Sequence, residues 1–131
     1  METNPSPPPP TFLPVLVVED DDAVRELISA VFQRFSIPYH STSSEEEARQ
    51  SWAQNQDPIG IALIDVTLPG ETSGVELALE FHATKSSLKV ILTSGYPKET
   101  VLKDLSLPEN FLFLEKPFAP TALVEMIQSL S

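Results

Sequence analysis

The chain has 131 residues, which is enough for one compact domain but too few for two ordinary ones, and its 41% of hydrophobic residues can form a sizeable core. Its 19 acidic residues outnumber 8 basic ones and give a formal net charge of −11. Such a surface repels nucleic-acid backbones and anionic membranes, because phosphate binding requires clustered Lys and Arg. The absence of cysteine excludes disulfides and thiolate chemistry, and the sequence has no signal peptide pattern or apolar run of about 18 residues. We therefore expect a cytoplasmic protein that binds neither nucleic acid nor membranes.

The first 12 residues differ from the rest because they are rich in proline and contain little that a core could bury. Such a composition favours an extended or disordered tail. We expect residues 1–12 to form this tail and residues 13–131 to form the folded domain. A ligand for a proline-binding module is an alternative role for the tail. The start at Met1 favours a natural N-terminus, and the chain is either a stand-alone domain or a piece of a longer protein.

After the tail, apolar runs of strand length alternate with amphipathic runs of helical length. The predicted strands cover residues 13–18, 37–41, 59–65, 88–93 and 111–114. The predicted helices follow the acidic run 19–22, cover residues 43–54, begin at residue 73 or 74, and cover residues 97–105 and 120–130. Their predicted inner faces consist of Val24, Leu27, Ile28, Val31 and Phe35 in the first helix, Val75, Leu77, Ala78 and Phe81 in the third, and Leu123, Met126 and Ile127 in the last. Five such units predict an α/β domain whose parallel sheet is covered on both faces.

In a sheet of this kind, ligands bind beyond the carboxyl ends of the strands, and five polar residues fall there. They are Glu19 and Asp20 after the first strand, Asp65 at the end of the third, Thr93 at the end of the fourth and Lys116 after the fifth. Three neighbouring carboxylates repel one another, and a hard divalent cation such as Mg²⁺ relieves that repulsion. Together with the ammonium and hydroxyl groups, they can compensate the charge on a phosphoryl group in transfer. Each residue alone is more often a cap, a turn residue or a bend, so the prediction depends on the whole set.

Four segments around these residues resemble the signature segments of response-regulator receiver domains. They read LVVEDD at 16–21, LIDVTLPG at 63–70, ILTSGY at 91–96 and EKPF at 115–118. The resemblance covers residues 14–131 and implies a single doubly wound (βα)5 domain of flavodoxin-like fold, with strand order 2-1-3-4-5. It implies a role in two-component signalling, where the domain acts as a phosphoacceptor switch. Its only enzymatic activities would be self-catalysed phosphoryl transfer and slow autodephosphorylation.

The resemblance also implies roles at the metal site. By this resemblance, Asp65 would be the phosphoacceptor, Asp20 and Asp65 would bind Mg²⁺ directly, Glu19 would act mainly through water, and the backbone carbonyl of Thr67 would supply a further ligand. Mn²⁺ would be able to replace Mg²⁺. Two features depart from the commonest family pattern: Glu19 stands in place of an aspartate, and the loop at residues 70–73 is one residue longer than in the shortest members.

A conformational switch is implied as well. Thr93 matches the family's switch hydroxyl, Lys116 its lysine beside the phosphate, and Phe113 its aromatic rotamer switch. The Lys116–Pro117 bond is expected to be cis. The phosphoryl donor is expected to be a sensor histidine kinase or a histidine phosphotransfer protein. A downstream protein would bind the face built from the fourth helix, the fifth strand and the last helix, and the chain would be a monomer or a weak dimer.

Two other functions are weighed against this one. A phosphohydrolase with an aspartyl-phosphate intermediate would use an Asp-x-Asp motif, and Asp20 and Asp22 have that spacing. Such enzymes also need a cap or a longer chain and a late acidic pair, which the sequence lacks. A receiver-like binding module without phosphorylation would not need the complete set of site residues. The segment TSGYP at residues 93–97 is similar to the corresponding segment of receivers attached to hybrid sensor kinases. The sequence identifies neither the kinase nor the downstream output.

Overall fold

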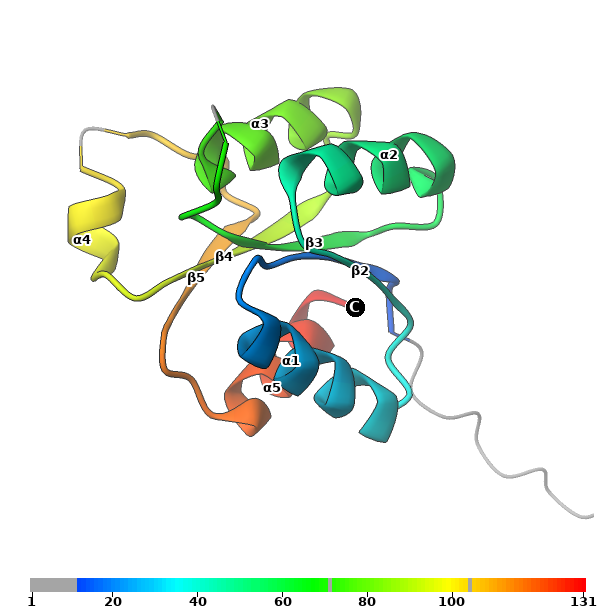
Figure 1. Cartoon of the computed structure of the whole chain (residues 1–131). Helices are drawn as coiled ribbons and strands as arrows, with labels where there is room; N and C mark the ends of the chain where they lie inside the picture. The colour runs from blue at the N-terminus through cyan, green and yellow to red at the C-terminus, as the bar shows by residue number, and fades with distance from the viewer. Residues whose placement is uncertain (1–11, 71, 104) are drawn as a thin grey trace, which may run out of the picture.

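The computed structural model describes residues 12–70, 72–103 and 105–131, which fold as five strand–helix units (Figure 1). The strands are β1 (Val15–Val18), β2 (Tyr39–Thr42), β3 (Ile61–Asp65), β4 (Lys89–Ser94) and β5 (Phe111–Glu115). The helices are α1 (Asp22–Arg34), α2 (Glu45–Asn55), α3 (Gly74–Thr84), α4 (Lys98–Val101) and α5 (Pro120–Leu130). The predicted succession is confirmed, and apart from α4 the predicted bounds lie close to these.

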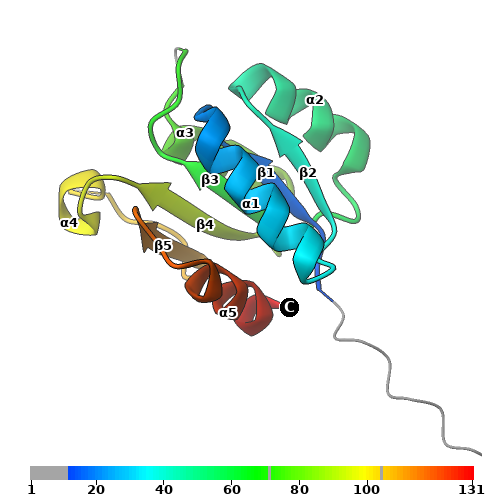
Figure 2. The ribbon, with the colours of Figure 1, turned by 60° about the horizontal axis from the view of Figure 1, so that its bottom comes forward.

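The five strands form one parallel sheet in the order β2-β1-β3-β4-β5, which confirms the doubly wound α/β fold. Helices α2 and α3 cover one face, and α1 and α5 cover the other (Figures 1 and 2). Because both faces are covered, β1 and β3 are buried along their whole length, and their sequences are continuous apolar runs. The parallel arrangement brings the carboxyl ends of all five strands to one edge of the sheet.

Local signals start the helices at that edge. The side chains of Asp21, Ser44 and Ser73 cap α1, α2 and α3 by accepting backbone N–H groups of the first turn. Helix α5 begins at Pro120, as predicted, because proline lacks the N–H that would be left without a partner in a first turn. The caps fix the chain where it passes from strand to helix, next to the strand ends.

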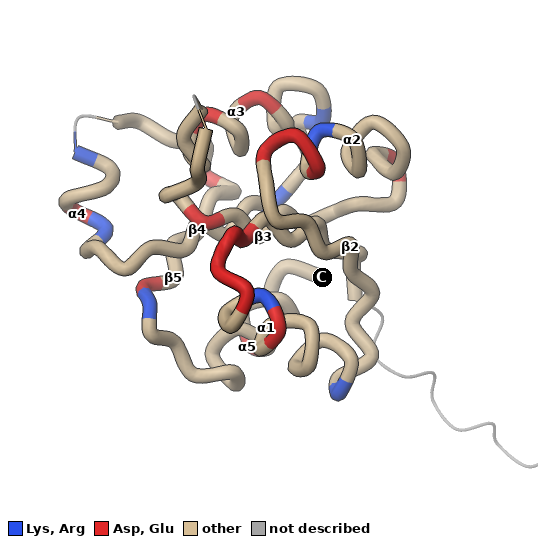
Figure 3. The backbone as a smooth tube through the Cα atoms, viewed as in Figure 1, with Lys and Arg blue, Asp and Glu red and all other residues tan. Residues whose placement is uncertain are grey.

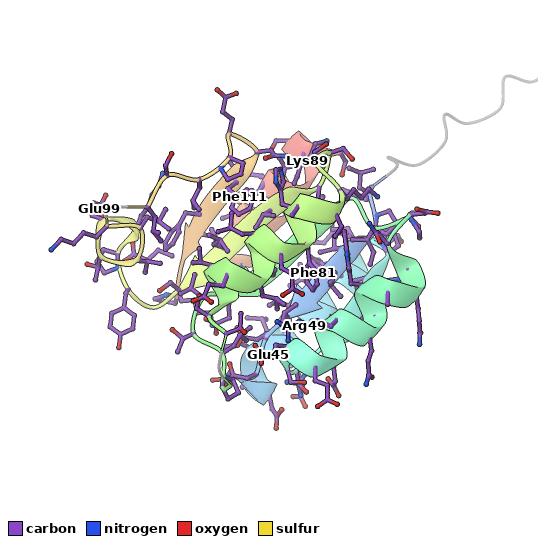
Figure 4. The ribbon with its side chains drawn as sticks, turned by 90° about the horizontal axis from the view of Figure 1, so that it is seen from above. Glu45, Arg49, Phe81, Lys89, Glu99 and Phe111 are labelled. Carbon is purple, nitrogen blue, oxygen red and sulfur yellow. The ribbon has the colours of Figure 1, made fainter. Side chains whose placement is uncertain are left out.

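The core consists of two apolar layers, one on each face of the sheet. In the layer beneath α2 and α3, Trp52 stacks on Phe81 with ring centroids 4.9 Å apart, and Figure 4 shows Phe81 between these helices. In the layer beneath α1 and α5, the fully buried Phe32 meets Tyr39 edge-on at 5.6 Å. The predicted inner face of α3 is confirmed, since all four of its residues are buried.

The buried face of α1 differs from the prediction. Ile28 and Val31 are buried as expected, but Leu27 is 47% exposed and Phe35 is 41% exposed, whereas Phe32 is completely buried. The apolar stripe of this helix is wider than the surface that covers it. Its flanking residues therefore remain at the surface.

The inner face of α5 is also slightly different from the predicted one. Leu123 and Ile127 are buried as expected, whereas Met126 is only partly buried and Val124 is buried in its place. Val124 and Met126 lie on opposite flanks of the stripe formed by Leu123 and Ile127, since residues two apart do not share a helix face, so the buried stripe is turned toward Val124.

Helix α4 is shorter than the predicted span of residues 97–105 and lies at the side of the sheet near β5 (Figure 1). It has four residues, none of them buried, and its N-cap residue Pro97 makes no side-chain capping bond. A helix this short gains little from backbone hydrogen bonding, and it needs a buried face to extend further. The half-buried Leu102 and Leu107 follow it and pack against the core.

Both ends of the described chain meet at the opposite edge of the sheet. The backbone N–H of Leu13 donates to Oγ of Ser131 at 3.1 Å, and Nζ of Lys89 donates to the carbonyl of Leu130 at 2.6 Å. Phe12 is buried in the layer beneath α1 and α5, so packing begins at least one residue earlier than the predicted boundary. The rest of the predicted tail, residues 1–11, lies outside the described residues. Within the described ranges, no helix has the length and apolar character needed to cross a bilayer.

Candidate functional site

The connection from β1 to α1 carries two of the predicted metal ligands. Glu19 is buried and Asp20 is exposed. Oε2 of Glu19 accepts the backbone N–H of Asp21 at 3.1 Å. The side chain of Asp21 in turn accepts the N–H groups of Ala23 at 2.9 Å and Val24 at 3.2 Å. Asp21 is therefore occupied as a helix cap, which leaves Glu19 and Asp20 as the candidate ligands of this connection.

Asp65 closes β3 and is buried, with 7% of its surface exposed. Its Oδ1 atom accepts the backbone N–H of Thr67 at 2.8 Å, a local turn that aspartate side chains favour. In the sheet register, Asp65 is paired with Thr93 of β4, which is also buried. The N–H of Val66 donates to the Thr93 carbonyl at 2.9 Å. Two of the predicted site residues, Asp65 and Thr93, are therefore neighbours on adjacent strands.

Lys116 bridges the acidic residue that follows β1 and the one that ends β3. Its Nζ atom donates to Oε1 of Glu19 at 2.6 Å and to Oδ2 of Asp65 at 2.9 Å. The Lys116–Pro117 bond is cis, as the resemblance implied. The backbone N–H of Lys116 donates to the carbonyl of Ser94 at 2.7 Å, which fixes the point at which the chain leaves β5.

Three carboxylates converge beside this ammonium group. Glu19, Asp20 and Asp65 each offer an oxygen, and these oxygens lie within 4.8 Å of one another. One lysine cannot neutralise three carboxylates, so the cluster retains excess negative charge. Oxygen donors at this spacing suit a hard divalent cation such as Mg²⁺, which uses one or two carboxylates and keeps several waters. The residues present therefore fit the metal that the resemblance implies.

The pKa values at the site show the cost of gathering these charges. Burial raises the pKa of Glu19 to about 7; the ammonium of Lys116 opposes this rise, and Asp65 adds to it. Burial alone would lower the pKa of Lys116, but its hydrogen bonds to Glu19 and Asp65 outweigh that effect and raise the pKa. Lys116 therefore stays charged at neutral pH, whereas Glu19 can take up a proton.

The surroundings of the cluster are acidic as well. Glu45, Glu46 and Glu47 form the first turn of α2, and Asp22 opens α1. Figure 3 shows acidic segments at the starts of both helices. The negative potential of this edge favours the approach of cations and of basic partners.

Gly74 supports the site in a way that the sequence reasoning missed. A Cβ atom at this position would lie 1.9 Å from the carbonyl oxygen of Asp65 and 2.7 Å from Cα of Val66. The backbone N–H of Gly74 donates to the Val66 carbonyl at 3.0 Å. The start of α3 can therefore press against the backbone of Asp65 only without a side chain. The sequence did contain a signal for this close approach, because glycine, a poor helix former, stands at the start of the predicted helix.

Two further residues bear on the predictions. Phe113 lies in β5 opposite Leu92, is half-buried and packs in the layer beneath α2 and α3. Its role as a rotamer switch stays a prediction. Asp22, the second acid of the Asp-x-Asp alternative, pairs with Arg25 and does not belong to the carboxylate cluster. The geometry therefore gives no support to the phosphohydrolase alternative.

The sequence matches the family model described as "Response regulator receiver domain" over residues 15–128. It is 31% identical over 116 residues to the sensor kinase CckA of Brucella abortus, covering 88% of this chain and 12% of CckA. It is 30% identical over 115 residues to the regulatory protein DctD of Pseudomonas aeruginosa, covering 87% of this chain and 24% of DctD. It is 26% identical over 116 residues to the receiver protein CpdR of Brucella abortus, covering 88% of this chain and 94% of CpdR. The chain thus spans a small part of CckA and DctD and nearly all of CpdR.

Solved structures share the fold. The receiver domain of the hybrid histidine kinase CckA is 25% identical with a TM-score of 0.75, covering 89% of this chain and 97% of that one. A receiver domain protein from Clostridium thermocellum is 20% identical with a TM-score of 0.80, covering 91% and 94%. At this lower identity the second likeness supports the fold alone.

Proposed function

The chain belongs to the response-regulator receiver family, the phosphoacceptor switches of two-component signalling, and we propose that its phosphoacceptor is Asp65. The observation that carries this proposal is the position of the Lys116 ammonium, 2.9 Å from Oδ2 of Asp65. An ammonium group beside a buried carboxylate at a strand end offsets the charge of an incoming phosphoryl group. Glu19, the other partner of Lys116, closes the site on the side of β1.

In the proposed reaction, Oδ2 of Asp65 attacks the phosphorus of a phosphohistidine. A phosphorus–oxygen bond forms while the phosphorus–nitrogen bond of the donor breaks, and the electron pair of that bond stays on the histidine nitrogen. Slow autodephosphorylation reverses the modification: water cleaves the aspartyl phosphate, which releases inorganic phosphate and restores the carboxylate. Lys116 stabilises the charge on the phosphoryl oxygens in both steps.

We propose that Asp20 and Asp65 hold Mg²⁺ directly, that Glu19 acts mainly through water and that the backbone carbonyl of Thr67 adds a ligand. The convergence of the three carboxylates supports this assignment. When bound, the ion would neutralise charge on the transferring phosphoryl group. Mn²⁺ would occupy the same oxygen site, since both ions favour carboxylate ligands.

The response to phosphorylation is proposed to pass through Thr93 and Phe113. A phosphoryl group on Asp65 would give the Thr93 hydroxyl a charged acceptor, which is stronger than a neutral one. Movement of that hydroxyl toward Asp65 would leave room for the half-buried ring of Phe113 to turn further into the core, burying apolar area at about 25 cal/mol per Å². The face built from α4, β5 and α5 would then change its shape and bind a downstream protein.

The proposed phosphodonor is a sensor histidine kinase or a histidine phosphotransfer protein. A donor that reaches Asp65 must cover the carboxyl edge of the sheet. There, Leu27 and Phe118 line an apolar depression of about 270 Å³ that also includes Lys116. Because Leu27 is half-exposed, this depression offers apolar contact beside the reacting group.

Acetyl phosphate with Mg²⁺ tests the proposal. Intact-protein mass spectrometry should detect a single phosphoryl adduct, which Asp65→Asn abolishes and Asp57→Asn, an exposed aspartate of the α2–β3 connection, retains. Asp20→Ala should lose nearly all labelling together with its dependence on Mg²⁺. Full labelling of Asp65→Asn would overturn the assignment.

A further inference from the structure

Arg25, one turn into α1, reaches back to the connection that carries the two acidic residues. Its Nη1 atom donates to the backbone carbonyl of Glu19 at 2.9 Å and lies 3.5 Å from that of Asp20. Its Nη2 atom pairs with the carboxylate of Asp22. The side chain of Arg25 is largely covered, with 23% of it exposed. It therefore ties the β1–α1 connection to the first turn of the helix.

These contacts fix the backbone from which the carboxylates project. At the start of the connection, the N–H of Glu19 donates to the carbonyl of Thr42 at 3.1 Å. At its end, Asp21 is anchored as the cap of α1. Arg25 acts between these two anchors, because it holds the carbonyl of Glu19 and approaches that of Asp20. Rotation of these peptide groups would move both carboxylates away from Asp65.

We propose that Arg25 is a positioning residue for the divalent cation: it holds the backbone of Glu19 and Asp20 so that their carboxylates meet that of Asp65. The inference rests on the proposed metal site. Arg25 is not itself a ligand, because a guanidinium has five donors and no acceptor. Its planar fork can hold a carbonyl and a carboxylate at the same time, which a lysine ammonium does with less geometric control.

Whether removal of the Arg25 guanidinium weakens or tightens metal binding distinguishes a positioning role of this residue from a purely electrostatic one. Arg25 places a positive charge beside an acidic cluster, and charge alone opposes cation binding. If charge were its only contribution, removing it would tighten metal binding. Positioning predicts the opposite, because loss of a group that orients metal ligands weakens affinity by roughly 10-fold or more.

Mn²⁺ binding to the full chain provides the test, with free Mn²⁺ measured from its electron paramagnetic resonance signal. We expect Arg25→Gln to weaken binding by roughly 10-fold. Arg25→Lys, which retains the charge, should weaken it by a smaller factor. Arg34→Gln is the matched control, because it removes the same charge from the exposed last turn of the same helix. The control should bind as the unmodified protein does or slightly more tightly.

A second measurement distinguishes positioning from a general loss of structure. In Arg25→Lys, the Mg²⁺ concentration for half-maximal labelling by acetyl phosphate should rise by the same factor as the Mn²⁺ dissociation constant. The labelling rate at saturating Mg²⁺ should recover most of its unmodified value. Unfolding would instead lower the rate at every metal concentration, and that result would overturn the inference.

Mn²⁺ binding to the unmodified protein and to Arg25→Gln distinguishes an error in the metal site from an error in the role of Arg25. If the unmodified protein binds no Mn²⁺, the proposed metal site is wrong and the role of Arg25 falls with it. If the unmodified protein binds Mn²⁺ while Arg25→Gln binds it equally well or more tightly, only the role of Arg25 is wrong.

Discussion

The pocket around Asp65 and the β4–β5 connection, residues 95–110, are built in opposite ways. In the pocket, buried carboxylates are held by an ammonium at 2.6 and 2.9 Å. In the β4–β5 connection, the helix has four residues and no buried side chain, and Tyr96 and Leu105 are 61% and 50% exposed. Polar contacts determine the geometry of the first region, whereas in the described part of the second α4 has no buried side chain and Leu102 and Leu107 are only partly buried against the core.

The two regions nevertheless adjoin at Ser94, which is completely buried. Its carbonyl accepts the backbone N–H of Lys116 at 2.7 Å, and its Oγ atom accepts that of Tyr96 at 2.9 Å. A change of charge in the pocket is therefore next to a segment whose helix has no buried side chain. In a switch domain this arrangement lets phosphorylation bias conformations that already exist.

Hydrogen exchange should give the largest contrast between the two regions. Because β3 is buried along its length and α4 has no buried residue, we expect the amides of β3 to exchange through global or near-global opening and those of α4 through local fraying. We expect rates that differ by at least about 1000-fold at neutral pH. Mass spectrometry of peptic fragments covering residues 61–65 and 98–101 measures this difference. Comparable protection of the two fragments would contradict the contrast.

Two glycine substitutions compare the regions directly. Gly74→Ala places a methyl group against the Asp65 backbone, so we expect about 3 kcal/mol of destabilisation, at the upper end for overpacking, and a severe loss of labelling. Gly95→Ala meets nothing within 4 Å and should change stability by less than about 1 kcal/mol. Urea unfolding measures both. Similar losses in the two variants would show that the pocket is no stiffer than the β4–β5 connection.

Thr93→Ala should separate the two regions without destroying either. The variant keeps Asp65, Glu19 and Lys116, so it should still be labelled by acetyl phosphate. It lacks the hydroxyl that would carry the signal onward. Amide chemical shifts with the phosphoryl analogue beryllofluoride should then change around Asp65 but not across the β4–β5 connection. Thr100→Ala, in exposed α4, serves as the control and should keep both sets of changes. Distant changes that survive in Thr93→Ala would refute the coupling.

An ion pair on the surface, outside both regions, shows how much an ordinary exposed contact contributes to stability. Arg49 on α2 bonds to Glu80 on α3 at 2.8 and 3.0 Å, and Figure 4 shows Arg49 on α2 where it faces α3. The hydrogen bond from Arg49 lowers the pKa of Glu80. A lowered pKa stabilises the fold above the unfolded-state value near 4.3 and loses this effect as the pH falls through the folded-state value.

Glu80→Gln should therefore cost about 0.3–1 kcal/mol at pH 7, because both side chains are partly exposed and solvent screens the pair. The cost should disappear on acidification below the lowered pKa. Urea unfolding at both pH values, with exposed Glu125→Gln as the control, measures it. A cost that does not depend on pH would show that packing, not charge, accounts for the contact.

Much of the fold could be predicted because its determinants are local or follow from strand direction. The continuous apolar runs of β1 and β3 indicate strands buried on both faces. Once the strands are taken as parallel, their carboxyl ends share an edge. For that reason Asp65, Thr93 and Lys116 could be brought together although many residues separate them in the chain.

The remaining features depend on distances that no pattern contains. The close approach of Gly74 to the Asp65 backbone is set by how α3 docks on the sheet. Leu27 and Phe35 belong to an apolar stripe by spacing, but the neighbouring elements decide how much of it they cover. The reach of Arg25 to the carbonyl of Glu19 depends on the path of the β1–α1 connection. Each of these is a consequence of tertiary packing.

The bond between Leu13 and Ser131 has a consequence for engineering. Because residues 12 and 131 lie on the edge opposite Asp65, a short flexible linker would join them at little cost in loop entropy. Such a circular permutant could be opened within the β4–β5 connection, where surface loops tolerate new ends. Fluorophores attached at these new ends would report, as a change in energy transfer, whether phosphorylation moves this part of the chain.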